Sequence, residues 1–157
     1  MRATGLAAAL LLAAGAAAAD DLSYAGGMGI DHPIGCLMAY PADKTGDHAS
    51  AVAILDACVA RGNVWSMIWL SMLHENGQGV PRSLEKAADL MRRGSALNDE
   101  AGYATLARYH WGVALVEGRG VPRDEGEGLR WLRIAAAEGA GDAKTFLRAR
   151  GEWWPGI

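Results

Sequence analysis

GQGVPR, residues 77–82, is followed 41 positions later by GRGVPR, residues 118–123. Self-similarity at a period of about 20 to 50 residues is typical of proteins built from stacked structural units. We therefore expect the chain to fold as a series of similar units, each of which contains this turn.

The repeated turn has the composition of a helix end followed by a helix start. A glycine that follows an apolar helix adopts the left-handed conformation, the valine adds an apolar contact, and the proline prevents the first helix from continuing. Ser83 and Asp124 are the expected N-caps of the helices that follow, and Asp124 and Glu127 have the spacing of a capping box. The turn residues of the two copies are Gly77, Gly79, Val80 and Pro81, and Gly118, Gly120, Val121 and Pro122.

Apolar residues with helical spacing follow each turn and form one stripe of a helix. These residues are Leu84, Ala87, Ala88 and Met91 in the first copy, and Leu129, Leu132, Ala135 and Ala136 in the second. An earlier helix ends at Gly62, the second copy ends at Gly139, and another helix begins within residues 141–149. Alternating β-branched runs are lacking, so the pattern predicts helices and no strands.

The two copies resemble Sel1-like repeats, which are relatives of the tetratricopeptide repeats. The first copy carries Ser66, Leu70, Ser71, His74, Gly77, Gly79 and Val80, the second carries Gly112, Gly118, Gly120, Val121, Trp131, Ala135, Ala136 and Gly139, and Ala143 and Leu147 open a third unit. His74 stands where the family usually has tyrosine. The resemblance implies an all-α fold, a short α/α solenoid with about two full helix-turn-helix repeats and a partial repeat at each end.

The second unit departs from the first in length. Asn98 and Gly118 are 20 positions apart, whereas Gly62 and Gly77 are 15 apart. We expect about one extra helical turn within residues 99–112, and we expect Asn98 to take the left-handed position that ends the preceding helix. Either Leu106–Ala107 or Trp111–Gly112 then occupies the Leu-Gly position of the repeat.

The N-terminus has the pattern of a secretory signal peptide. A basic start precedes an uncharged apolar run that closes with small residues at Ala19. A membrane anchor is the alternative, but it needs about 20 apolar residues and more positive flanking charge. We expect cleavage after Ala19, export to the bacterial periplasm and no membrane span in the mature chain. The expected segments are a signal peptide at 1–19, an irregular segment at 20–46, the repeat domain at 47–149 and a C-terminal tail or cap at 150–157.

Charge and cysteine content narrow the classes further. The chain carries a formal net charge of −3 without any run of Lys or Arg, which argues against a nucleic-acid partner. Cys36 and Cys58 are its two cysteines, and an exported chain with an even number predicts one disulfide between them. Two free thiols in the core are the alternative. Zinc spacing is absent, so we expect no metal site and no cofactor.

Two apolar surfaces are candidate sites for a partner. The helix around Trp65, Trp69 and Met72 is apolar nearly all round, which indicates either an exposed groove or a surface that residues 20–46 fold back to cover. If that segment covers it, the equivalent residues Leu106, Tyr109, His110 and Val113 are the better candidates. Trp153 and Trp154 present a similar choice between a cap for the last repeat and a hook for a partner.

The family resemblance also implies a function, because Sel1-like proteins typically bind other proteins. We expect an adaptor or accessory subunit of a cell-envelope complex, with a periplasmic inhibitor, regulator or immunity-type protein as the alternative. An enzyme is a remote third possibility, because the sequence has no GxSxG, HExxH or phosphate-loop motif and no catalytic residue can be named.

Overall fold

The structure, a computed structural model, describes residues 29–32 and 34–152, and this part of the chain folds into helices without strands. The expected signal peptide at 1–19 and the tryptophans at 153 and 154 lie outside the described residues. The elements are η2 (Gly35–Met38), α1 (Ala39–Lys44), α2 (His48–Ala60), α3 (Val64–Asn76), α4 (Leu84–Ser95), α5 (Tyr103–Glu117), α6 (Glu125–Ala137) and α7 (Gly141–Ala149).

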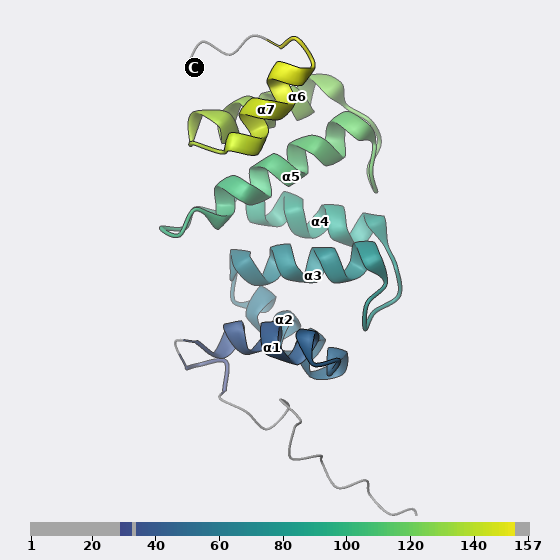
Figure 1. Cartoon of the computed structure of the whole chain (residues 1–157), viewed down its shortest axis with the longest axis vertical. Helices are drawn as coiled ribbons and strands as arrows, with labels where there is room; N and C mark the ends of the chain where they lie inside the picture. The colour runs from purple at the N-terminus through teal and green to yellow at the C-terminus, as the bar shows by residue number, and fades with distance from the viewer. Residues whose placement is uncertain (1–28, 33, 153–157) are drawn as a thin grey trace, which may run out of the picture.

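The helices stack one upon the next along the long axis of the molecule (Figure 1). Helices α3 and α4 form one helix-turn-helix unit and α5 and α6 form the next, with α1 and α2 before them and α7 after them. Consecutive helices pack against each other, and α3 also contacts α5. The expected all-α solenoid is confirmed.

Each repeated turn ends its first helix as predicted. Gly77 and Gly118 both have a φ of 70°. The next amide, that of Gln78 or Arg119, donates to the carbonyl of Leu73 or Ala114 respectively, a pattern that closes a helix end. The Ser83 and Asp124 side chains then accept the amides of Lys86 and Glu127, which confirms both N-caps.

Other residues of the turn have roles that the sequence analysis did not assign. The Arg82 and Arg123 side chains donate 2.9 Å hydrogen bonds to the carbonyls of Glu75 and Val116, which lie in the last turns of α3 and α5. These bonds satisfy carbonyls that have no partner inside the helix. Arginine therefore recurs because it caps the helix that the glycine ends.

The second glycine of each turn contacts the preceding unit. A Cβ on Gly79 would lie 2.6 Å from the Cβ of His48, and one on Gly120 would lie 2.1 Å from the carbonyl oxygen of Leu84. His48 and Leu84 are the first residues of α2 and α4. The turns thus set the distance between successive units, and α2 occupies the place of α4 in a shortened leading unit.

Two apolar clusters form the core of the stack. The larger cluster extends from α1 to α5 and includes Leu55, Met67 and Leu73, while the smaller one joins α5, α6 and α7 around Leu132 and Leu147. The predicted stripe of α6 lies in the smaller cluster, and Ala88 and Met91 of the α4 stripe lie in the larger one. Ala87 is buried as well, whereas Leu84 is only partly buried. The helical periodicity therefore identified the packed faces.

Part of the segment expected to be irregular is helical. Residues 35–44 form η2 and α1. Pro41 is compatible with α1 because it falls in the first turn, where a missing N–H costs no helical hydrogen bond. The predicted disulfide between Cys36 and Cys58 is confirmed and joins η2 to α2. Such an intramolecular bond indicates an oxidising compartment.

The unit boundary before α5 also differs from the expectation. Helix α5 has 15 residues and α3 has 13, so most of the added length lies in the connection after α4 and not in an extra helical turn. Asn98 does not adopt a left-handed conformation, since every described residue with positive φ is a glycine; its side chain instead accepts from Arg108. Gly102, with φ of 80°, precedes α5.

Candidate partner-binding surface

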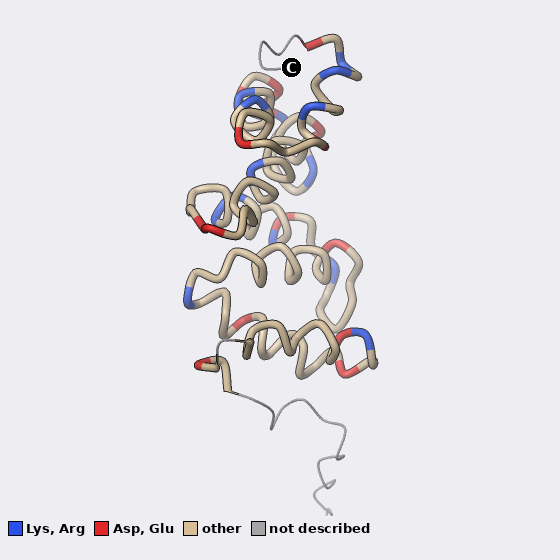
Figure 2. The backbone as a smooth tube through the Cα atoms, turned by 60° about the vertical axis from the view of Figure 1, so that its left-hand side comes forward, with Lys and Arg blue, Asp and Glu red and all other residues tan. Residues whose placement is uncertain are grey.

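One side of α3 carries the first set of predicted residues. Trp65, Trp69 and Met72 are spaced by four and three positions, so they project from the same side of the helix. The Met72 side chain is 43% exposed, whereas both tryptophans are partly buried. The sequence from Val64 to His74 contains no Lys, Arg, Asp or Glu, so this part of α3 is tan in Figure 2.

The N-terminal segment partly covers this side of α3. The Trp65 and Trp69 rings stack with centroids 5.8 Å apart, and Tyr40 of α1 meets Trp69 edge-on at 5.2 Å. The Lys44 ammonium lies 5.2 Å from the Trp69 ring centre. Residues of the N-terminal segment therefore cover Trp69, as one of the two interpretations of the sequence expected, but they leave Met72 exposed.

A residue from α5 continues the same surface. Met72 and His110 line one pocket of about 40 Å³ between α3, α4 and α5, whose floor includes Ile68 and Met91. This volume is far below the range of about 300 to 1,000 Å³ that is typical of small-molecule sites. The pocket has room for the end of one side chain of a partner, and not for a cofactor.

Charged groups at this pocket are paired. Glu75 at the end of α3 accepts a 2.9 Å hydrogen bond from Arg119 in the turn after α5. Burial lowers the pKa of His110 below its ordinary value of 6.5, although the side chain keeps a surface open to solvent. His110 therefore adds a polar group to the pocket, and its surroundings favour the neutral imidazole.

We refer to Tyr40, Trp65, Trp69, Met72 and His110 as the A face. Ring contacts join Tyr40 to Trp69 and Trp69 to Trp65, and Met72 follows on the same side of α3 and lines one pocket with His110 of α5. The contribution of Tyr40 was missed, because α1 lies outside the repeat pattern. Its only sequence signal was an aromatic residue near a cysteine that could tie the segment down.

The remaining residues predicted on α5 lie elsewhere. Val113 is only 8% exposed and belongs to the core beside α6, so its expected place in an open groove is wrong. Leu106 and Tyr109 line a shallow depression near the turn between α6 and α7. Tyr109 still touches His110, with ring centroids 5.0 Å apart, and burial raises the pKa of its hydroxyl.

A further depression, which the sequence analysis did not identify, lies on the opposite side of α3. It has a volume of about 480 Å³ and is open to solvent above Leu70 and His74. Charged residues of both signs surround it: the acidic Asp56, Glu85 and Asp89 and the basic Lys86 and Arg93. His74 is buried there with Nδ1 3.4 Å from the Pro81 carbonyl, in keeping with a packing role.

Residues 29–32 and 34–152 contain no group of three or more His, Cys, Asp or Glu that could hold a metal ion. Over the same residues no helix has the length and apolar character needed to span a bilayer.

Comparison with known proteins identifies a repeat and a fold. A model of the Sel1 repeat matches residues 66–99 and 105–139, and no curated protein matches the sequence. A Sel1 repeat protein from Oxalobacter formigenes aligns with a TM-score of 0.61 at 22% identity, over 73% of this chain and 88% of that one. A protective antigen of uropathogenic Escherichia coli strains with an SLR fold aligns with a TM-score of 0.60 at 23% identity, over 69% of this chain and 23% of that one. At these identities the structural likeness extends to the fold alone.

Proposed function

Because this chain carries Sel1 repeats at residues 66–99 and 105–139, we propose that it binds another protein in the bacterial periplasm through the A face. Sel1 repeats are generally protein-protein interaction modules. In this proposal the protein is an adaptor or accessory subunit of a cell-envelope complex. The alternative within the same class is a regulator or immunity-type inhibitor of its partner.

The observation that carries this proposal is the continuity of the A face across three helices. Aromatic residues and methionine are enriched at the energetically dominant parts of protein interfaces. Met72 and Tyr40, both more than two-fifths exposed, flank the partly buried tryptophans. The pocket beside Met72 and His110 would receive an apolar side chain of the partner.

The periplasmic location rests on two further features. The first 19 residues have the composition of a secretory signal, and the disulfide between Cys36 and Cys58 needs an oxidising compartment to persist. Both features fit export across the inner membrane of a bacterium.

The proposal is tested by affinity capture from the cell envelope with tagged protein. We expect one protein to be captured in a fixed ratio by the wild type and lost with Met72→Glu, which places a charge on the exposed part of the A face. Leu37→Glu is the matched control, because Leu37 is 47% exposed on η2 and outside the A face. Capture that survives Met72→Glu, or that Leu37→Glu removes equally, contradicts the proposed site.

A further inference from the structure

We propose that Asp43, Tyr40 and Trp69 form a binding site for a basic side chain of the partner protein, which Lys44 occupies in the unbound protein. This inference rests on the proposed function, because it specifies what the partner presents to the A face. It concerns the N-terminal end of that face, where α1 meets α3.

Three groups surround one ammonium at this point. Lys44 Nζ lies 5.6 Å from the centre of the Tyr40 ring, 5.2 Å from that of Trp69 and 3.8 Å from Asp43 Oδ2. Both ring distances are within about 6 Å, the range in which an aromatic face attracts a cation. A carboxylate and two rings thus favour positive charge at the same place.

The carboxylate is fixed and almost fully buried. The Asp43 side chain is 2% exposed, and its Oδ1 lies 3.0 Å from both His48 Nδ1 and Gln78 Nε2. Gln78 belongs to the first repeated turn, so the carboxylate is held by the following unit as well as by its own. The disulfide from Cys36 to α2 further restrains the segment that carries Asp43 and Tyr40. A site that is already ordered binds with less loss of conformational entropy.

Lys44, in contrast, is replaceable. It is the last residue of α1, and its side chain is 55% exposed. Its ammonium lies 3.8 Å from Asp43 Oδ2, which is beyond hydrogen-bond distance, so the ion pair holds Lys44 only weakly. A partner's basic side chain can therefore take the place of the Lys44 ammonium while the rest of the partner contacts Met72 and the pocket beside His110.

Charge at larger scale favours the same class of ligand. The α3 side of the site has no charged residue between Val64 and His74, so no second cation of this helix competes there. The formal net charge of −3 attracts a basic segment over longer distances. The expected ligand is therefore a Lys or Arg side chain beside apolar residues.

The test removes the Lys44 side chain from the site and titrates a small lysine derivative in its place. N-acetyl-lysine methylamide is titrated against wild type and Lys44→Ala, with the ring signals of Tyr40 and Trp69 followed by NMR. We expect Lys44→Ala to bind roughly fivefold more tightly than wild type, because one cation–π contact no longer competes. Lys86→Ala is the matched control: it removes the same charge from an exposed position on α4.

Two further measurements make the result specific. N-acetyl-norleucine methylamide has a similar aliphatic chain without the charge, and we expect it to leave the ring signals unchanged. Tyr40→Leu in the Lys44→Ala background should weaken lysine binding severalfold. Tyr40 is 49% exposed, so this change leaves the core intact. Equal binding by Lys44→Ala and Lys86→Ala, equal binding of the norleucine compound, or no effect of Tyr40→Leu overturns the proposal.

The titration is independent of the capture experiment, since it contains no partner protein. A selective gain in Lys44→Ala without any captured partner would support the cation site and reject the proposed protein-binding role. A partner captured through Met72 without a gain in Lys44→Ala would do the reverse.

Discussion

Glycines with similar left-handed backbones differ in what surrounds them. Gly62, Gly118 and Gly120 all have positive φ, between 70° and 80°. A Cβ on Gly62 would meet nothing within 4 Å, whereas one on Gly120 would lie 2.1 Å from the Leu84 carbonyl oxygen. Gly120 is therefore needed for its conformation and for the approach of two backbones.

Gly120→Ala and Gly62→Ala separate these two requirements. We expect Gly62→Ala to lower the free energy of unfolding by about 1 kcal/mol, the cost of a left-handed residue with a Cβ. Gly120→Ala should cost about 1 to 3 kcal/mol more, because α4 and the turn must move apart. Chemical denaturation measures both values, and equal losses would show that the contact with Leu84 is unimportant.

The protonation of His110, on the A face, makes the stability of the protein depend on pH. Burial first, and Arg119 in addition, lower its pKa, while Glu75 and Asp142 oppose the shift. The folded protein therefore binds a proton on His110 less readily than the unfolded chain does. The contribution of His110 to stability is complete above the unfolded value near 6.5 and is lost as the pH falls through that value towards the lower folded pKa. We expect His110→Gln to reduce the loss of stability between pH 7 and pH 5, measured by denaturation; an unchanged pH profile would contradict this assignment.

Two glycines lie where α5 and α6 are in close contact. A Cβ on Gly112 of α5 would lie 2.9 Å from the carbonyl oxygen of Gly128 on α6, and one on Gly128 would lie 2.7 Å from that of Gly112. The equivalent positions of α3 and α4, 41 residues earlier, are Ser71 and Ala87. The close contact of α5 and α6 thus depends on two glycines, and Gly112, at the position equivalent to Ser71, places Trp111–Gly112 in the Leu-Gly position of the repeat.

Two glycine-to-alanine changes in this unit should have opposite effects. Gly112→Ala is expected to lower the free energy of unfolding by about 1 to 3 kcal/mol, because its methyl group would force α5 from α6. Gly126→Ala on the exposed side of α6 should raise it by about 0.5 to 1 kcal/mol, since alanine is the better helix former and has space. Thermal or chemical unfolding of both variants checks the signs. A stabilising Gly112→Ala would mean that the helices are not in close contact.

The elements that the sequence predicted are those encoded by local chemistry. The turns, their N-caps and the apolar stripes depend on residues within a few positions of each other. Helix α1 was missed because it is short and contains Pro41, and because Asp43 and Cys36 hold it through partners far along the chain. The place of Asn98 was wrong for a related reason: one Arg108 side chain bonds both Asn98 and the Leu97 carbonyl, which organises the connection without a left-handed residue.

The candidate site was predictable only in part. Helical spacing grouped Trp65 with Met72, but it could not tell that Val113 faces α6 while His110 faces α3. That distinction depends on the crossing of α5 over both neighbours. The contribution of Tyr40 and Lys44 to the site could not be predicted, because it depends on how α1 folds back on α2.

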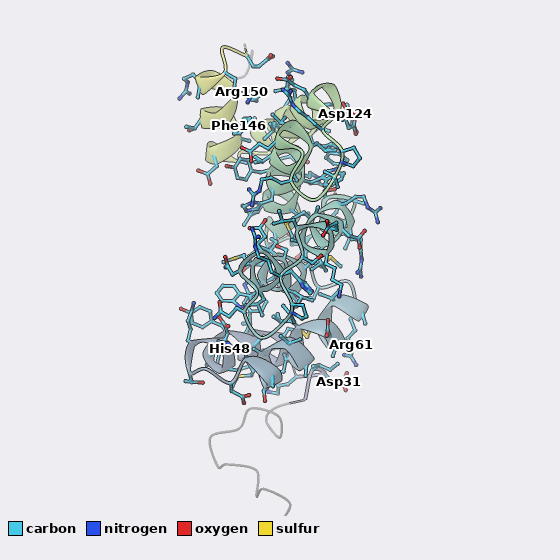
Figure 3. All side chains as sticks on the ribbon, turned by 90° about the vertical axis from the view of Figure 1, so that its right-hand side faces the viewer. Asp31, His48, Arg61, Asp124, Phe146 and Arg150 are labelled. Carbon is cyan, nitrogen blue, oxygen red and sulfur yellow. A yellow bond between two sulfur atoms is a disulfide. The ribbon has the colours of Figure 1, made fainter. Side chains whose placement is uncertain are left out.

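The whole molecule is a stack with differently built ends. At one end Asp31 pairs with Arg61, and at the other Arg150 lies 5.5 Å from the Phe146 ring centre and bonds Glu125 (Figure 3). The exposed residues of α7 are largely polar. The opposite end exposes Ile34 and Leu37 and depends on a covalent bond.

The disulfide should stabilise the N-terminal end of the stack more than the rest of the molecule. In a repeat stack each unit contacts chiefly its neighbours, so a local change is felt most in the adjacent unit. The disulfide joins positions 22 apart, and a closed segment of this size stabilises by roughly 3 kcal/mol in the chain-entropy model. Cys36→Ala/Cys58→Ala should therefore weaken hydrogen-exchange protection strongly in α1 and α2 and little in α5 and α6, whose own cluster around Leu132 stays intact. Native-state hydrogen exchange resolved by helix measures this gradient. A uniform loss along the chain would mean that the stack unfolds as a single cooperative unit, and unchanged protection in α2 would mean that packing alone holds the N-terminal end.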